Sequence, residues 1–207
     1  MTKFTFLMLL SLFVLSPFIS MGQDVETNEG IKPALLVIDV QNVYLPMMDQ
    51  DAIDRPIDMI NASVWVFNEF KLPIIYVYHQ DTEGGPPADS KEFEFTERIP
   101  VPEDATKVIK HYGNAFNKTK LDQKLKDLGC NTVFLCGLSA TGCVMSTYVG
   151  ASDLDYNTFI IKDAVMSDDL EKTKMMEEKN TTSECLLFPE YLPSFSFSPD
   201  HHSLQHL

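Results

Sequence analysis

Short apolar segments that each end near a polar residue constrain the fold of this chain more than any other feature. Ala34–Val40 (ALLVIDV) is apolar except for Asp39, and the segments at Ile74–His79 and Thr132–Cys136 have a similar character. Such continuous runs are typical of strands buried on both faces of a parallel sheet. Between the first two runs, apolar residues recur at spacings of three and four from Ile53 to Phe70. This spacing predicts an amphipathic helix between two parallel strands.

The same alternation continues along the chain. Further strands are predicted at Thr106–Lys110 and Thr158–Lys162, and further helices near 119–129, from Cys143 to about Leu154, and at Asp169–Lys179. Alternating strands and helices predict an α/β fold, a three-layer αβα sandwich with a mostly parallel sheet. No internal repeat divides the chain.

Three regions differ in composition. Residues 1–22 contain Lys3, an apolar run and the small-residue end Ser20-Met21-Gly22, which predicts a secretory signal peptide cut before Gln23. A membrane anchor is the alternative, but Ser11, Ser16 and Pro17 interrupt the run. We therefore expect an exported protein, periplasmic or secreted, with its domain at 23–188. Residues 189–207 are rich in proline, serine and histidine and are predicted to be an unstructured tail.

Charge and cysteine content narrow the class of protein. A formal net charge of −14 over 207 residues argues against nucleic acid or an anionic membrane as a partner and leaves a small-molecule substrate open. The four cysteines have no CxxC or Cys/His spacing of a zinc site. A Cys130–Cys185 disulfide remains an alternative for two of them.

Three polar residues are predicted at carboxyl ends of strands or in the turn that follows: Asp39, Lys110 and Cys143. In a parallel sheet these ends share one edge. Cys143 is predicted to open a helix, whose N-terminus favours a thiolate. Cys143 would attack a carbonyl, Asp39 would carry the proton, and Lys110 would lower the thiol pKa. The alternative is that each residue has an ordinary packing or solvated role.

The sequence resembles the isochorismatase-like cysteine hydrolases, which include nicotinamidases, N-carbamoylsarcosine amidases and ureidoacrylate amidohydrolases. The resemblance covers about Pro33 to Ser167 and is carried, in order, by ALLVIDVQNVY, IIYVYHQD, VIKHYGNAFNKTKLDQKLKDLG, TVFLCGLSATGCVMST and TFIIKDAVMS. It implies about six mainly parallel strands and a catalytic triad of Asp39, Lys110 and Cys143. It also implies a cis peptide bond between Leu138 and Ser139, and an oxyanion hole formed by the N–H groups of Ser139 and Cys143.

Departures from family patterns refine the expected activity. The resemblance implies that a cysteine at position 143 favours C–N over vinyl-ether hydrolysis. Nicotinamidases have an Asp/His metal site after the second strand, whereas this chain has His79-Gln80-Asp81 without a second histidine nearby. We therefore expect neither a bound metal nor any other cofactor.

The expected function is hydrolysis of an amide or ureido bond in a small molecule through a thioester, by a homo-oligomer. The alternatives are an isochorismatase-type or other non-amide hydrolase, and a catalytically silent binding domain. Six flanking residues are candidates for substrate binding. Gln41 and Asn42 are candidates for orienting Asp39 or the substrate, and Tyr44, Tyr112 and Phe116 for pocket walls. His79 is a candidate for a hydrogen bond at the pocket edge, with the end of a strand as the alternative.

Overall fold

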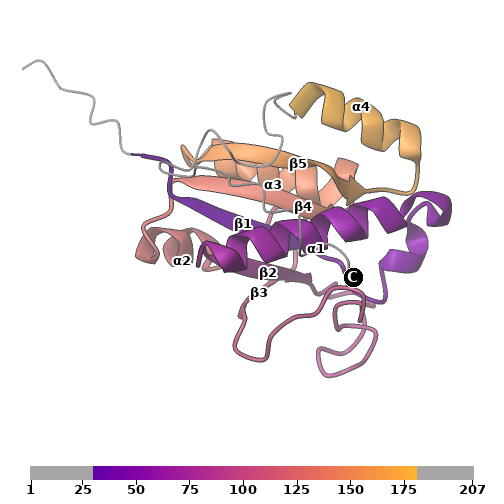
Figure 1. Cartoon of the computed structure of the whole chain (residues 1–207). Coiled ribbons are helices and arrows are strands. Elements are labelled where there is room, and N and C mark those ends of the chain that lie inside the picture. The colour runs from indigo at the N-terminus through magenta and orange to yellow at the C-terminus, as the bar shows by residue number, and fades with distance from the viewer. Residues whose placement is uncertain (1–29, 181–207) are drawn as a thin grey trace, which may run out of the picture. The chain divides into compact units, whose positions relative to one another are not determined.

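The computed structural model describes residues 30–180, shown in colour in Figure 1. The predicted signal peptide at 1–22, a possible last edge strand at Cys185–Phe188 and the predicted tail at 189–207 lie outside the described residues.

Five parallel strands form one sheet in the order β3-β2-β1-β4-β5 (Figure 1). Their bounds are β1 Pro33–Ile38, β2 Ile74–His79, β3 Thr106–Lys110, β4 Thr132–Leu138 and β5 Asn157–Met166. The predicted α/β class and parallel sheet are confirmed. The expectation of about six strands is corrected to five among the described residues. Strand β5 continues past its predicted end at Lys162, and its register with β4 shifts between Leu135 and Gly137.

Four α-helices connect and cover the strands: α1 Asp54–Glu69, α2 Leu121–Asp127, α3 Met145–Ser152 and α4 Leu170–Asn180. Three short helical turns lie at η1 Leu45–Met47, η2 Gln50–Ala52 and η3 Ala140–Val144. Among residues 30–180, no helix combines the length and the apolar character needed to cross a membrane.

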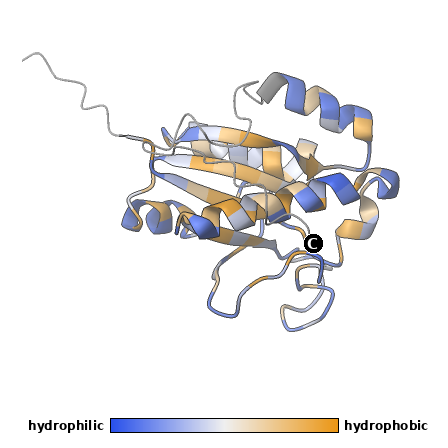
Figure 2. Cartoon of the chain, viewed as in Figure 1, coloured by the Kyte–Doolittle hydropathy of each residue, from blue (hydrophilic) through white to orange (hydrophobic). Residues whose placement is uncertain are grey.

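Two apolar clusters cover opposite faces of the sheet, because neighbouring strand residues point to opposite sides. On one face, Leu35 and Val37 of β1 pack with Ile57, Ile60 and Phe67 of α1. On the other face, the partners come from the remaining helices and turn η3, and the cluster includes Leu36, Ile38, Leu121, Leu125, Val144, Ala151 and Met176. Figure 1 shows α1 in front of the sheet and α3 behind it. Strands β1 and β4 are accordingly orange along most of their length in Figure 2.

The order in which successive strands are added to the sheet reverses between β1 and β4. Strands β2 and β3 are added on one side of β1, and β4 and β5 on the other. Open α/β sheets bind ligands at the carboxyl ends of strands where this reversal occurs. In this protein the position lies between Asp39, which follows β1, and the turn that follows β4.

Candidate active site

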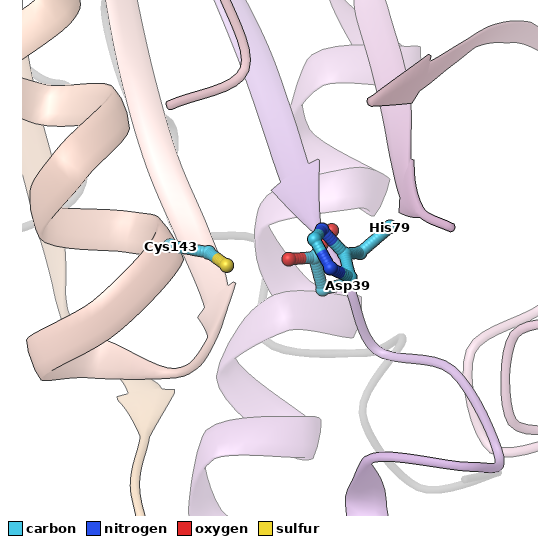
Figure 3. A group of neighbouring side chains, drawn as sticks. All are labelled: Asp39, His79 and Cys143. Carbon is cyan, nitrogen blue, oxygen red and sulfur yellow. The ribbon is translucent and has the colours of Figure 1, made fainter. Parts of the chain in front are cut away.

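The side-chain ammonium of Lys110 lies at the centre of the predicted catalytic group. Its Nζ is 2.7 Å from Asp39 Oδ2 and 3.2 Å from Cys143 Sγ. Lys110 is fully buried, Asp39 is 2% exposed, and Cys143 is partly buried. Figure 3 shows Cys143 reaching toward Asp39 and His79 from the opposite side of the site. The three residues that sequence reasoning selected therefore lie together at one edge of the sheet.

Strand register explains why residues far apart in the sequence meet here. Lys110 ends β3 and pairs with His79, the last residue of β2. Asp39 directly follows β1, and its backbone N–H donates to Val77 O of β2 at 2.9 Å. Asp39 has a φ of 57°, a left-handed conformation that short polar residues tolerate better than most. This conformation ends the strand at the site, and the chain turns away after it.

Cys143 lies in the π-helical turn η3, whereas the sequence predicted that it would open an α-helix. Turn η3 spans Ala140–Val144, and α3 begins at Met145. The Ser139 carbonyl accepts from the N–H of Val144 at 3.1 Å, a bond that spans five residues. In a regular α-helix that carbonyl would accept from Cys143 instead. In the π turn, the Ser139 carbonyl, which would be the usual acceptor for the Cys143 N–H, accepts from the N–H of Val144 instead.

The end of β4 is held unusually close to β1. A Cβ atom on Gly137 would lie 2.1 Å from Ile38 O, and the φ of Gly137 is +113°. Only glycine permits this conformation and this approach without rearrangement. The peptide bond between Leu138 and Ser139 is cis, as the family resemblance implied. These residues bring the turn that carries Cys143 next to Asp39.

Burial controls the protonation of the two acidic members of the triad. It raises the pKa of the Asp39 carboxyl from 3.8 to about 6, against the opposing charge and hydrogen bond of Lys110. Burial, followed by the charge of Asp39, raises the pKa of the Cys143 thiol to about 11, again against Lys110. The expectation of a lowered thiol pKa is therefore corrected. Lys110 does favour the thiolate, but desolvation of the sulfur is the larger effect.

His79 and Gln41 form a second layer around Lys110. His79 Nδ1 lies 3.0 Å from Lys110 Nζ. The fully buried Gln41 side chain accepts from the His79 backbone N–H at 2.7 Å and donates to the His79 carbonyl at 3.2 Å. Gln41 also donates to Phe93 O at 2.8 Å. The sequence suggested that Gln41 could orient Asp39 or substrate, whereas its hydrogen bonds hold the end of β2 and the following loop.

Tyr44 and Asn42, two further candidates from the sequence, have different neighbours. Tyr44 packs edge-on against the His79 ring, with 5.7 Å between ring centroids. Asn42 instead holds the long loop, because its side-chain amide donates to Lys91 O at 2.8 Å. Tyr44 thus belongs to the site, and Asn42 supports the loop beside it.

Tyr112 and Phe116 follow β3 but do not have equivalent positions. Tyr112 is 42% exposed, and its hydroxyl accepts from Lys118 Nζ at 2.9 Å. Phe116 stacks on Tyr156 at 5.8 Å between centroids and packs against the same apolar cluster as Cys143. Tyr112 therefore pairs with Lys118 at the surface, and Phe116 packs in the cluster beside Cys143.

The loop between β2 and β3 contributes a feature that sequence reasoning missed. Phe93 and Phe95 are buried and pack on Tyr78, and Phe95 forms an isolated antiparallel bridge with Gln41. The alternating pattern Glu92-Phe93-Glu94-Phe95 is the signal that could have revealed it, because period-two alternation indicates a half-buried extended segment. This segment anchors the loop next to the site.

Three side chains at the site carry possible metal-ligand atoms. Ligand atoms of Asp39, His79 and Cys143 lie within 4.8 Å of one another. The ammonium of Lys110 contacts all three, at 2.7, 3.0 and 3.2 Å. A cation bound among these atoms would meet this buried positive charge. With Lys110 in place, these residues do not fit a metal centre.

Two further cysteines lie among the described residues, Cys130 and Cys136. Cys130, Cys136 and Cys143 are free thiols, and both Cys130 and Cys136 are buried. Cys185, the suggested partner of Cys130, lies outside the described residues.

Comparison with known proteins agrees with the fold. Residues 33–183 match the family described as the Isochorismatase domain. The uncharacterized isochorismatase family protein YddQ of Bacillus subtilis is 28% identical over 73% of this chain and 84% of its own length. The secreted isochorismatase effector Isc1 of Verticillium dahliae is 25% identical over 75% of this chain and 84% of its own.

Solved structures share the fold. N-carbamoylsarcosine amidase from Thermoplasma acidophilum superposes with a TM-score of 0.62 and 24% identity over 72% of this chain and 92% of that protein. The pyrazinamidase of Pyrococcus horikoshii, in complex with zinc, has a TM-score of 0.63 and 22% identity over 72% and 93%. The match of residues 33–183 to the family model shows that the chain belongs to the isochorismatase family of hydrolases.

Proposed function

We propose that the protein is a cysteine-dependent amidohydrolase, which cleaves a C–N bond in a small amide or ureido compound through a thioester. The observation that carries this proposal is the contact of one buried ammonium, Lys110, with both Asp39 and Cys143. A nucleophile, a proton carrier and a cation that orients them are the groups that such a reaction needs. The solved relatives named as an amidase and a pyrazinamidase share this fold and support the same choice.

In the first half of the reaction, Cys143 Sγ attacks the substrate carbonyl carbon and gives its proton to Asp39. Asp39 Oδ2 pairs with Lys110 at 2.7 Å. A side-chain hydrogen bond joins the Asp39 carboxylate to the Cys143 thiol, so the carboxylate is placed to take the proton. A pKa of about 6 suits Asp39 to this exchange, because a general base works best when its pKa is near the working pH.

The tetrahedral intermediate then loses the amine. The N–H groups of Ser139 and Cys143 would hold its oxyanion. Asp39 returns the proton to the leaving nitrogen as the C–N bond breaks, which leaves an acyl thioester on Cys143. Water attacks this thioester and gives a proton to Asp39, and the sulfur recovers that proton as the C–S bond breaks. The products are ammonia or an amine and the corresponding acid.

A raised thiol pKa is compatible with this sequence of steps. At neutral pH the resting Cys143 is a thiol, so its proton must move to Asp39 as the carbon–sulfur bond forms. The nucleophile is thus activated by an adjacent base, one of the two usual routes for a cysteine.

The test is release of ammonia or amine from a panel of carboxamides, N-carbamoyl amino acids and ureido acids. Cys143→Ala should abolish release, whereas Cys130→Ala, at a buried thiol outside the site, should retain it. Mass spectrometry of the intact protein mixed rapidly with an active substrate should detect the acyl adduct on Cys143. Equal activity of Cys143→Ala and the natural protein would refute the proposal.

Export is also proposed. The predicted signal at residues 1–22 and the secreted character of the fungal relative both support it. If the prediction is right, the protein recovered outside the cytoplasm begins at Gln23. A recovered protein that retains residues 1–22 would contradict cleavage at this position.

A further inference from the structure

Lys110 is held by three acceptors rather than by the two triad residues alone. An ammonium group carries three N–H donors and no acceptor. Its Nζ lies 2.7 Å from Asp39 Oδ2, 3.2 Å from Cys143 Sγ and 3.0 Å from His79 Nδ1. Lys110 is fully buried, so solvent cannot replace an acceptor that is removed. His79 therefore satisfies the donor that Asp39 and Cys143 leave over.

This contact fixes the chemical form of His79. Because an ammonium can only donate, Nδ1 must be the unprotonated nitrogen, and the neutral ring carries its proton on Nε2. Lys110, His111 and Asp81 act on the ring by their charges, and Tyr44 packs against it. Asp39 and Cys143 also each place a ligand atom within 4.8 Å of a ring nitrogen. Burial, then the charges of Lys110 and His111, lower the pKa of His79 to about 4, and Asp81 opposes them. The ring is therefore a neutral acceptor at physiological pH.

The position of the ring is also fixed. The backbone N–H of His79 donates to the Gln41 side chain at 2.7 Å, and the His79 carbonyl accepts from it at 3.2 Å. Gln41 follows Asp39 by two residues, and Tyr44 packs against the ring. One short segment after β1 therefore carries Asp39 and also holds the residue that supports Lys110.

We propose that His79 is a positioning residue of the active site, which accepts the third proton of Lys110 and thereby keeps the ammonium between Asp39 and Cys143. This inference rests on the proposed function for its catalytic consequence. It assigns to His79 a role distinct from binding substrate and from binding metal. Without the acceptor at Nδ1, the ammonium would have to turn toward another partner and would leave its place beside the sulfur.

Two amide substitutions test whether Lys110 needs an acceptor at the position of Nδ1 or whether any polar side chain at position 79 is sufficient. In His79→Asn the side-chain oxygen can lie near the position of Nδ1, whereas in His79→Gln the longer side chain carries it past that position. Lys110 should stay in place in the first variant and move in the second. We expect kcat of His79→Gln to fall on the order of tenfold or more, with KM little changed, and His79→Asn to recover most of the loss.

A second readout needs no substrate. The charge of Lys110 favours the thiolate of Cys143, so displacement of Lys110 should slow alkylation of that thiol. Iodoacetamide labelling at pH 8, with Cys143 followed by peptide mass spectrometry, should be several-fold slower in His79→Gln than in His79→Asn. Far-ultraviolet circular dichroism and thermal unfolding establish that both variants are folded.

The outcomes are distinct. Equal kcat and equal labelling rates in the two variants would overturn the role of His79, as would a change in KM alone, which indicates substrate binding. If the natural protein cleaves no amide, the proposed function fails, yet the labelling comparison still decides whether His79 holds Lys110. If His79→Gln does not fold, His79→Leu, which also lacks an acceptor at the position of Nδ1, is compared with His79→Asn, and equal labelling rates in these two variants would refute the inference.

Discussion

The ammonium of Lys110 and the carboxylate of Asp39 form an ion pair of 2.7 Å in which the two side chains are 0% and 3% exposed. Such a pair has lost its hydration, so each charge depends on the other. The pair joins β3 to the end of β1 across the intervening strand β2. It therefore stabilises the fold and shapes the site at once, and its removal should affect both.

Loss of either partner should destabilise the protein strongly. Lys110→Met leaves the Asp39 carboxylate buried without its partner, and we expect a loss of about 3–5 kcal/mol in the free energy of unfolding by urea. Lys126 provides a matched control, because it pairs with Asp122 at the same 2.7 Å but is 59% exposed. Lys126→Met should cost about 0.5 kcal/mol or less. Similar losses in both variants would contradict a special role of burial.

Activity should depend on the ionisation of Asp39. Proton transfer from the thiol requires the carboxylate form, and burial raises the pKa of Asp39 to about 6. The value of kcat/KM should therefore rise with pH through a midpoint near 6 and become level above it. A profile from pH 4 to 8 with an active amide measures this. A midpoint near 4, the ordinary range of an aspartate, would contradict the raised pKa of Asp39.

Stability should respond to the ionisation of His79 in a defined window. Burial, then Lys110, lowers its pKa from 6.5 to about 4 in the folded protein. Between these values the unfolded chain binds the proton and the folded protein does not, so His79 contributes stability above pH 6.5 that is lost as the pH falls toward 4. His79→Asn lacks this titration.

The measurement is urea unfolding of the natural protein and His79→Asn at pH 4.5, 5.5 and 7.5. Relative to the variant, the natural protein should lose stability at the lower pH values. Titrations shared by both proteins largely cancel in this difference. A difference that is constant with pH, or that grows in favour of the natural protein on acidification, would contradict the lowered pKa of His79.

The sequence was sufficient for the fold class because continuous apolar runs directly indicate buried parallel strands. Strands β2 and β3 have the predicted bounds, Ile74–His79 and Thr106–Lys110. The irregular parts were less accessible. The extension of β5 past Lys162 and the π turn around Cys143 depend on how these segments pack against the rest of the fold. Neither feature has a periodic pattern of apolar residues in the sequence.

The candidate site was predicted in part for a related reason. Asp39, Lys110 and Cys143 were identified because parallel strands bring their carboxyl ends to one edge. Their burial was not predicted, since it depends on the surrounding layers, and the thiol pKa was consequently expected to fall. Sequence reasoning considered the helix end and the charge of Lys110, whereas desolvation of Cys143 is the larger effect.

Gln41 should be needed for both stability and activity. Its fully buried amide makes three hydrogen bonds to the backbone of His79 and Phe93. Gln41→Leu has a similar size but leaves these backbone groups without partners, at a cost of about 1–3 kcal/mol each. We expect a lower free energy of unfolding and faster proteolysis of the loop that contains Phe93. Asn42→Ala, which affects the same loop at a more exposed bond, should have a smaller effect; the reverse order would contradict this account.

Gly137 should be the least replaceable glycine near the site, because a side chain there faces two obstacles. Its φ is +113°, and a Cβ would lie 2.1 Å from Ile38 O, a backbone atom that cannot move without separating β4 from β1. Gly129 is the matched control, with a φ of +70° and no atom within 4 Å of an added Cβ. Gly129→Ala should cost about 1–2 kcal/mol, the penalty of the left-handed conformation alone. Gly137→Ala should cost more than about 4 kcal/mol or prevent folding, since it adds a backbone clash in the core.

Urea unfolding of both variants measures the difference, and soluble yield gives a lower limit if Gly137→Ala does not fold. Equal free energies of unfolding would mean that the two strands separate easily at this point, and the close approach that places Cys143 beside Asp39 would then not be a fixed part of the structure.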